Sequence, residues 1–263
     1  MTRPLTTFLK FCAALLLVPA PALAATAVQP TPDVKVFAFI AKRADLSDGQ
    51  FHAHWREPHG RLAKKVPQIR RYHQNHGIGA VPTVPGLAPT PYLGIATIWV
   101  ADLVKLGAIY GDPGYVEIHE DELNLLDRNQ LIWLVTREWV IAPGPRADDL
   151  DFTPTKAQLL LKRRADVPVA DFEAAIGRIA SGGRRKTAAI AATYALAFAD
   201  AYPSVDRPPF DAVIELSYQD SARFEKAWRR SGSALLERLA KVADLDASRG
   251  FLAREERVIW PWR

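Results

Sequence analysis

The histidines are the residues of this chain whose positions say most about chemistry. The sequence holds six, and all of them lie in its first half, at positions 52, 54, 59, 73, 76 and 119. An imidazole can accept a proton, donate one or bind a metal near neutral pH. The confinement of the histidines to one half therefore predicts an asymmetric protein with its site in that half.

Three of the histidines fall on a segment, 47–65, with helical periodicity. Its apolar residues and one histidine recur on one face of a helix, at Phe51, Trp55, His59, Leu62 and Val66. This stripe is expected to be buried. His59 then points inward, either as a core histidine bonded to a backbone group or as the base of a pocket. His54 lies off the stripe and, with Trp55, is expected to contact a ligand, whereas His52 is expected to be exposed.

A second group lies on a strand expected near 69–78. By the period of two, one face of this strand carries Tyr72, Gln74 and His76, and the other carries Arg71, His73 and Asn75. We expect Tyr72 and His76 to project into a barrel interior, where Thr97 and Trp99 would also meet a ligand. A phenol and an imidazole there can polarise a carbonyl group and move a proton. The alternative is that Tyr72 fills the core with its hydroxyl group bonded.

Metal and cofactor motifs are weak in this sequence. His52 and His54 point in different directions on a helix, and no Asp or Glu completes a recognisable set with His59, so we predict no metal site. No glycine-rich nucleotide motif and no nucleophile elbow is present, so we predict no cofactor. Haem held by a single histidine stays open as an alternative.

The elements that position these residues occur twice. The segment 42–46, followed by Phe51, recurs 121 residues later as 163–167, followed by Phe172. The segments 95–102 and 213–220 match at a shift of 118 residues, and at the same shift Glu138 falls on Glu256. Such self-similarity predicts a duplicated unit.

Each unit is expected to run strand, helix, strand, strand, helix, strand, which is the ferredoxin-like order. Strands are expected near 34–41, 69–78, 92–100 and 131–141, and again near 157–164, 187–196, 211–218 and 250–259. The intervening helices are expected near 47–65, 101–124, 168–180 and 220–241. The fold class is thus α+β, with two fused ferredoxin-like repeats, 33–142 and 155–263, and a Pro- and Asp-rich linker, 143–154.

A ferredoxin-like sheet carries helices on one face, so its open face must be covered. The two repeats are expected to cover each other, packed sheet to sheet as an intramolecular α/β barrel. This is a pseudo-dimer within one chain, and a homo-oligomer is compatible with it. In the 211–218 strand, polar residues alternate with apolar ones, which places Glu215 inside as a ligand contact. A buried carboxylate there needs a raised pKa or a partner such as Arg254.

The stretches Phe51–Leu62 and Val66–His76 resemble the EthD domain family, with His-Trp, a second histidine and a strand carrying Tyr and Gln-Asn-His. The second repeat resembles a degenerate copy, because Ala175 and Ala180 stand where His54 and His59 are expected. The resemblance implies the dimeric α/β-barrel group, which includes cyclases, dehydratases, cofactor-free monooxygenases and haem-handling proteins. It implies a small, apolar, oxygenated ligand and lyase, cyclase or oxygenase chemistry with His59, Tyr72 and His76. The alternative is a non-catalytic carrier of a small molecule or of haem.

The first 24 residues have the features of an export signal. Arg3 and Lys10 precede the apolar run 11–18, and Ala-Leu-Ala ends at position 24. We therefore expect a periplasmic or secreted protein with no membrane segment after cleavage. Removing the signal lowers the formal net charge from +5 to +3, an excess too small and too scattered to suggest nucleic acid as a partner. It also removes the only cysteine, so disulfides and thiolate chemistry are excluded from the mature chain.

Overall fold

The computed structural model describes residues 28–145, 152–198, 201 and 208–260. The expected signal, residues 1–24, and half of the expected linker, residues 146–151, lie outside these ranges. Within the described residues no helix is long and apolar enough to cross a membrane.

The expected order of strands and helices is confirmed in both halves of the chain. In the first half the strands are β1 (Pro30–Ile40), β2 (Arg71–Gly77), β3 (Gly94–Val100) and β4 (Ile132–Ala142). The second half has β5 (Thr155–Arg163), β6 (Ala191–Ala197), β7 (Ala212–Tyr218) and β8 (Ala243–Ile259). The last strand begins seven residues earlier than the sequence indicates.

The described strands form one closed antiparallel barrel in the order β1-β3-β2-β8-β5-β7-β6-β4. The first half supplies four neighbouring strands and the second half supplies the other four. The halves join at two seams, where β2 pairs with β8 and β4 pairs with β6. The predicted barrel is therefore confirmed, and because it is closed it leaves no unpaired edge between the halves.

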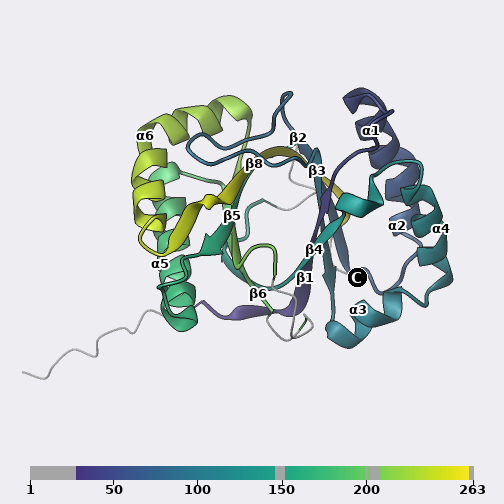
Figure 1. The fold of residues 1–263 in the computed structure, drawn as a ribbon, viewed down its shortest axis with the longest axis horizontal. Helices are drawn as coiled ribbons and strands as arrows, with labels where there is room; N and C mark the ends of the chain where they lie inside the picture. Colours follow the sequence, from purple (N-terminus) through teal and green to yellow (C-terminus); the bar gives the residue numbers. More distant parts are fainter. Residues whose placement is uncertain (1–27, 146–151, 199–200, 202–207, 261–263) are drawn as a thin grey trace, which may run out of the picture.

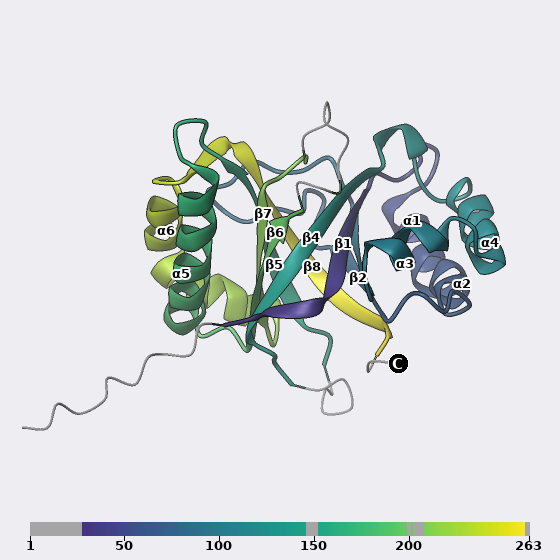
Figure 2. The same cartoon turned by 90° about the horizontal axis from the view of Figure 1, so that it is seen from below.

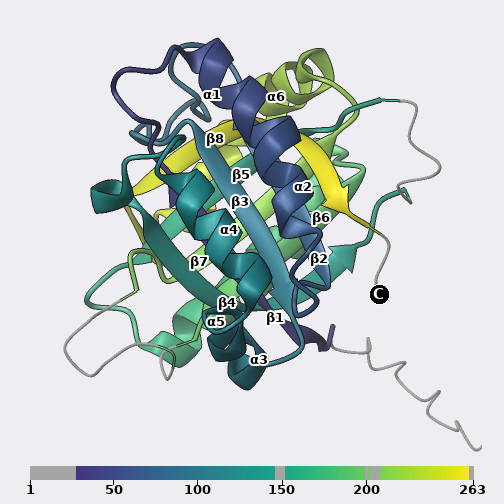
Figure 3. The ribbon, with the colours of Figure 1, turned by 90° about the vertical axis from the view of Figure 1, so that its right-hand side faces the viewer.

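Helices cover two opposite sides of the barrel (Figures 1 and 2). On one side lie α5 (Val169–Thr187) and α6 (Ser221–Leu239). On the other side lie α1 (Asp48–His54), α2 (Gly60–Ala63), α3 (Leu103–Ile109) and α4 (Pro113–Glu122). Figure 3 looks onto this second side, where α2 and α4 cross the sheet of the first half. A short 3₁₀ turn, η2 (Arg128–Gln130), precedes β4.

The helix expected over 47–65 contains a π turn, η1 (Trp55–His59), between α1 and α2. The Ser47 hydroxyl caps the helix by accepting a hydrogen bond from the backbone N–H of Gln50. The side-chain oxygen of Gln50 in turn accepts one from the backbone N–H of Ser47. A π turn is closed by bonds between residues five apart and is frequent at functional sites. It changes the buried stripe, because Ala63 is buried where Leu62 was expected.

Alternation along the strands separates two environments. On β1, Val36 and Ala38 pack under the helices, whereas Lys35 and Phe37 point into the barrel. On β7, Glu215 points inside as predicted, and its apolar neighbours pack against α5 and α6. The barrel interior is apolar at one end and charged at the other.

The prediction for β2 is wrong in its facing. Tyr72 packs on the helix side, while Arg71 and His73 face the interior with Thr97 and Trp99. Residues directly opposite in an antiparallel pair share a face. Arg71 pairs with Trp99 and His73 pairs with Thr97, so the interior position of β3 fixes that of β2. Neither face of β2 is purely apolar, so the sequence pattern alone could not decide between them.

Candidate functional site

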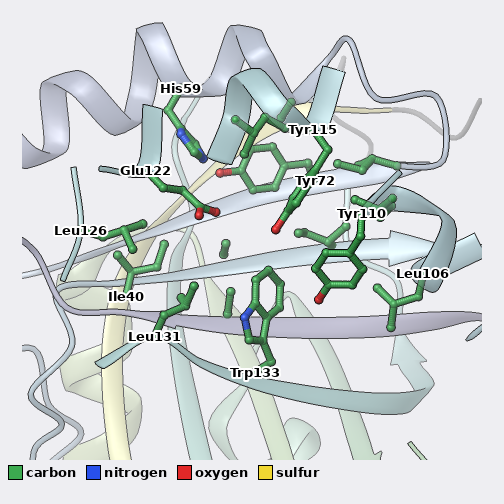
Figure 4. A pocket seen from close by; sticks show the side chains of 17 residues that line it. Ile40, His59, Tyr72, Leu106, Tyr110, Tyr115, Glu122, Leu126, Leu131 and Trp133 are labelled. Atoms are coloured by element: carbon green, nitrogen blue, oxygen red, sulfur yellow. The ribbon is translucent and has the colours of Figure 1, made fainter. Parts of the chain in front are cut away.

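An apolar pocket lies between the outer face of the first-half sheet and helices α2, α3 and α4 (Figure 4). We call it the helix-side pocket. Its floor is formed by Ala38 of β1 and Ala96 of β3, which are directly paired. Small side chains on strands that mostly carry bulky ones leave this space unfilled. Its walls are mainly aliphatic and aromatic, and three of them are Leu106, Ile109 and Trp133.

His59 lines this pocket, as expected if it is the base of a pocket and not a core histidine bonded to a backbone group. It is 7% exposed, and its Nδ1 lies 2.9 Å from Oδ2 of Asp121 on α4. His54 Nε2 lies 2.7 Å from the other oxygen of the same carboxylate. The wider π turn brings these two histidines, five residues apart, to one partner. His54, which was expected off the stripe as a ligand contact, does not line the pocket, and sequence reasoning did not identify Asp121.

Asp121 fixes the chemistry of His59. Burial alone would raise the pKa of this carboxyl group, but hydrogen bonds from His59 and His54 outweigh burial and hold its pKa below the ordinary value. The carboxylate therefore accepts a hydrogen bond from the N–H at His59 Nδ1. The other ring nitrogen, Nε2, is left as a base, and Figure 4 shows the imidazole pointing toward Glu122 and Tyr115.

Tyr72 reaches the same pocket from β2. Its hydroxyl oxygen accepts hydrogen bonds from Trp55 Nε1 at 2.9 Å and from Gln74 Nε2 at 3.2 Å. Burial raises the pKa of the phenol, so it stays protonated and can donate its own hydrogen. Both expected alternatives for Tyr72 are thus met, since it packs in the core with a bonded hydroxyl and also faces a cavity. Trp55 does not line the pocket but orients this hydroxyl group.

Glu122 adds a carboxyl group that sequence reasoning missed. It is 5% exposed, and burial raises its pKa above the ordinary value, with the charge of His59 opposing. A raised pKa favours the protonated form, which can donate a hydrogen bond, whereas Arg128 and His119, at 3.8 and 3.5 Å from its Oε2, favour the carboxylate. The helical spacing of Tyr115, Ile118 and Glu122 on α4 is the signal that places it on the inner face of this helix.

His76 was expected inside the barrel beside Thr97 and Trp99, but it lies on the helix side of the sheet and does not line the helix-side pocket. Its Nδ1 lies 2.9 Å from Nδ1 of His52, its Nε2 lies 3.1 Å from the Gln74 side chain, and its ring packs on Trp55. Burial first, and the nearby His52 next, lower the pKa of His76 to about 3. His52 is half-buried by the same contact instead of exposed. Among the described residues no group of three or more His, Cys, Asp or Glu side chains could hold a metal.

The other expected ligand contacts lie on the far side of the sheet, inside the barrel. Thr97 accepts a hydrogen bond from Asn75, and Trp99 donates to Glu138 at 2.8 Å. Glu215 is bound by Lys35 and by Gln158, not by Arg254. Burial would raise the pKa of Glu215, but the neighbouring lysines keep it well below the ordinary value. The expected acid is therefore an ionised partner of buried lysines.

Comparison with known proteins supports the assignment of the first half. Residues 43–129 match the model of the EthD domain. No curated protein sequence matches the chain.

Among solved structures, an anthrone oxidase-like protein is similar with a TM-score of 0.55 at 9% identity, covering 87% of this chain and 94% of that one. A candidate monooxygenase from Fusobacterium nucleatum subsp. nucleatum gives 0.53 at 7% identity, covering 86% and 93%. An ethyl tert-butyl ether D family protein from Bacillus halodurans C-125 gives 0.33 at 16% identity, covering 39% of this chain and 95% of that one. At identities this low, the first two likenesses show a shared fold and no more.

Proposed function

With residues 43–129 forming an EthD domain, we propose that the helix-side pocket binds a small, largely apolar, oxygenated molecule and that His59 moves a proton on it. The observation that carries the proposal is the convergence of an Asp-held imidazole, a protonated phenol and a buried carboxyl group in an otherwise apolar cavity. Apolar pockets with a few convergent polar groups and perturbed pKa values are the usual form of small-molecule sites.

The geometry favours proton abstraction next to a carbonyl or phenol oxygen. His59 Nε2 accepts the proton, and Asp121 stabilises the imidazolium that forms. The substrate oxygen, which gains negative charge, accepts hydrogen bonds from the Tyr72 hydroxyl and the Glu122 carboxyl group. Elimination, ring closure or reaction with dioxygen can follow from such an enolate, so the proposal covers a cofactor-independent lyase, cyclase or oxygenase.

Two alternatives to catalysis are a carrier of a small molecule and a haem-binding protein. A non-catalytic carrier is favoured by the predominantly aliphatic and aromatic lining of the pocket. Haem, which proteins of the wider fold group handle, does not fit the pocket in this form, because Glu122 and Tyr115 lie next to the His59 imidazole (Figure 4). A Soret band in the absorbance spectrum of the purified protein would contradict that statement.

The experiment is mass spectrometry of small molecules retained by the purified protein, followed by binding and turnover assays with the compound identified. His59→Ala should abolish turnover, and Tyr72→Phe should lower it about 10²–10⁴-fold, as expected for lost acid–base help. Val104→Ala is the control, because this side chain is 79% exposed and does not line the helix-side pocket. His119→Ala should also do little, although its Nδ1 lies 3.5 Å from Glu122, because the side chain is 44% exposed and outside the pocket. Retention that is unchanged in Ala96→Leu, which fills the pocket floor, would refute the proposed location. Binding without turnover would assign the carrier role.

We also propose that the chain is a fused duplication with units 33–142 and 155–263. The same turn occurs in both halves, where Arg43 forms paired bonds of 2.9 and 2.7 Å to Asp45, and Arg164 forms bonds of the same lengths to Asp166. Proteolytic cleavage within 143–154 should leave the two fragments associated, because two strand seams hold them. Fragments that separate without denaturant would contradict this pseudo-dimer.

Export is the remaining proposal, supported by the sequence of residues 1–24 alone. The mature protein should begin near Ala25 in the periplasm or medium. N-terminal sequencing of the protein recovered from these fractions tests it, and full-length protein in the membrane fraction would contradict it.

A further inference from the structure

The positive charge of this protein gathers on the helices of the second half. Helices α5 and α6 carry nine Lys and Arg residues against four Asp and Glu residues, an excess of five positive charges. Because the expected mature chain has a net charge of +3, the rest of it carries a net charge of −2. These two helices lie on the other side of the barrel from the helix-side pocket (Figures 1 and 2). The excess that looks scattered in the sequence is therefore concentrated on one face.

A pocket of about 150 Å³ opens on this face, where the C-terminal end of α5 meets the N-terminal half of α6. We call it the α5–α6 pocket. The two helices are joined there by a 3.1 Å hydrogen bond from the Ser231 hydroxyl to the Lys186 backbone oxygen. Four cationic side chains line the pocket, namely Lys186 on α5 and Arg223, Lys226 and Arg230 on one face of α6. None of its lining residues is acidic.

The four cations have no counter-ion within the part of the chain that the structure describes. There, every carboxylate oxygen lies more than 4.0 Å from their charged nitrogens. The acidic residue next to them on α6, Glu225, pairs instead with Arg229 at 3.5 Å. The helix dipole accounts for Lys186, which lies in the last turn of α5, but not for Arg223, because the first turn of α6 favours acidic residues. An anion in the pocket would compensate all four charges.

Tyr218 supplies an independent sign of a ligand. Its side chain lines the pocket from the end of β7 and is 2% exposed, and its hydroxyl group has no hydrogen-bond partner among the described residues. Burial raises the pKa of this phenol to about 12, so the hydroxyl keeps its hydrogen. The neighbouring Thr187 hydroxyl opposes that rise, but it donates its own hydrogen to the Gly183 oxygen at 2.9 Å. Buried donors are normally bonded, so the Tyr218 hydroxyl calls for an acceptor.

We propose that the α5–α6 pocket binds a phosphate group. A phosphate monoester carries close to two negative charges near neutral pH and several acceptor oxygens, so it can meet several cations and the Tyr218 hydroxyl together. Guanidinium groups bind phosphate oxygens in pairs, and a lysine binds them as a point charge. A carboxylate, with one charge and two oxygens, would leave most of these donors unused. The pocket recognises the phosphate group itself, whether that group belongs to a soluble molecule or to a lipid headgroup.

The test is isothermal titration calorimetry of the purified protein with inorganic phosphate near neutral pH and at constant ionic strength, with acetate for comparison. Phosphate should bind saturably at one site per chain and more tightly than acetate. No saturable binding of phosphate, or equal responses to phosphate and acetate, would overturn the proposal. The site is separate from the helix-side pocket, so this result does not depend on whether that pocket is catalytic.

Two further probes distinguish the sources of the phosphate group. Glycerol 3-phosphate represents a soluble monoester, and vesicles of phosphatidic acid, with phosphatidylcholine vesicles as the control, represent a lipid headgroup. Saturable binding of glycerol 3-phosphate without binding to the vesicles supports a soluble ligand. Binding to phosphatidic acid vesicles but not to phosphatidylcholine vesicles supports a lipid. Binding to neither probe would overturn the proposal.

Two double variants locate the binding. Arg223→Gln with Lys226→Gln removes two positive charges from the pocket and should weaken phosphate affinity at least about tenfold. Arg184→Gln with Arg185→Gln removes the same charge from exposed positions of α5 that do not line the pocket, and should weaken it less than about threefold because exposed charges are screened. Thermal melting verifies that both variants fold. Equal losses in the two double variants would show a diffuse attraction to the basic face and overturn the site.

Tyr218→Phe separates a ligand contact from a structural tyrosine. Since the hydroxyl group is buried without a partner, its removal should not lower the melting temperature of the free protein. The same change should weaken phosphate affinity about threefold to tenfold, because the bound phosphate loses one hydrogen bond from a neutral donor. Unchanged phosphate affinity, or a lowered melting temperature in the absence of phosphate, would show that the hydroxyl does not await a ligand and would overturn the proposal.

Discussion

His73 should make the protein sensitive to mild acid. Its imidazole is buried and uncharged in the folded chain, with a pKa lowered to about 4 chiefly by burial, against 6.5 for the exposed side chain. As the pH falls, the unfolded chain binds this proton before the folded chain does. The contribution of His73 to stability is therefore fully present above pH 6.5 and is lost as the pH falls from 6.5 to 4. At about 1.4 kcal/mol for each pH unit, His73 alone contributes a loss of about 3 kcal/mol.

The assay is urea unfolding at several pH values between 7 and 4, a window in which Glu215 and Glu255 remain ionised because the neighbouring cations lower the pKa of both carboxyl groups. Other groups titrate too, and His76 contributes in the same direction because its pKa is lowered to about 3. The measured quantity is therefore how far the free energy of unfolding falls between pH 7 and the lowest pH, compared between the wild type and His73→Gln. The fall should be about 3 kcal/mol smaller in His73→Gln. His119→Gln, on the half-exposed face of α4, should follow the wild type. Parallel curves for the wild type and His73→Gln would refute the buried, neutral histidine.

Three further predictions follow from single contacts. Lys35→Met leaves Glu138 buried without an ammonium partner and Glu215 with Lys156 alone, so it should cost about 3–5 kcal/mol in urea unfolding at pH 7; a loss below about 1 kcal/mol would contradict this. Asp121→Asn removes the carboxylate that holds the His59 tautomer, so the ¹⁵N shifts of that ring should move toward a tautomer mixture, and unchanged shifts would refute the pairing. Gly94→Ala would place a methyl group 2.5 Å from Cζ3 of Trp55 and should destabilise the protein by about 1–3 kcal/mol in thermal melts, whereas Gly107→Ala, with open space around it, should not.

Much of the fold could be predicted from the sequence, because the internal similarity of the two halves and the alternation along the strands can both be read from residue types. The buried stripe of α1 and η1 follows from helical spacing, and the repeated basic-Ala-Asp turn marks the start of each half. The π turn could not be predicted, since nothing in the spacing of Trp55 and His59 distinguishes four residues per turn from a wider one. The extension of β8 could not be predicted either, because its first half, 243–250, mixes charged and apolar residues without alternation.

For the candidate site, the sequence named residues that the structure brings together, but not how they are arranged. His59 and Tyr72 share one cavity, but Thr97, Trp99 and Glu215 lie on the opposite face of the same sheet. The sequence places side chains on faces only where one face is clearly apolar, and β2 is polar on both. Asp121 escaped notice because it follows two other polar residues on an exposed-looking helix. Its role depends on a contact between two helices, which local spacing does not encode.

Strands β4 and β8, which join the two halves of the barrel, show that a constant shift in numbering does not by itself identify equivalent residues of the two halves. Both carry a shift of register, in β4 between Val140 and Ala142, and in β8 where Arg257 and Ile259 face consecutive residues of β2. An extra residue in a bulge reverses the alternation beyond it. This reversal returns Trp260 to the interior, over Arg71, where strict alternation from Arg257 would have turned it toward the helices.

The strand pairs also correct the equivalence of the glutamates. Asn75 of β2 faces Glu255, and Ala195, the corresponding residue of β6, faces Glu138. Glu138 therefore corresponds to Glu255 inside the barrel and not, as the shift of 118 suggests, to Glu256, which binds Arg56 outside. Lys35 and Lys156, 121 residues apart, then complete a symmetric pair of buried ion pairs. The symmetry ends beyond these pairs. The shift of 117 residues that relates Glu138 to Glu255 makes Pro143 the counterpart of Trp260, so the indole in one half corresponds to a proline in the other.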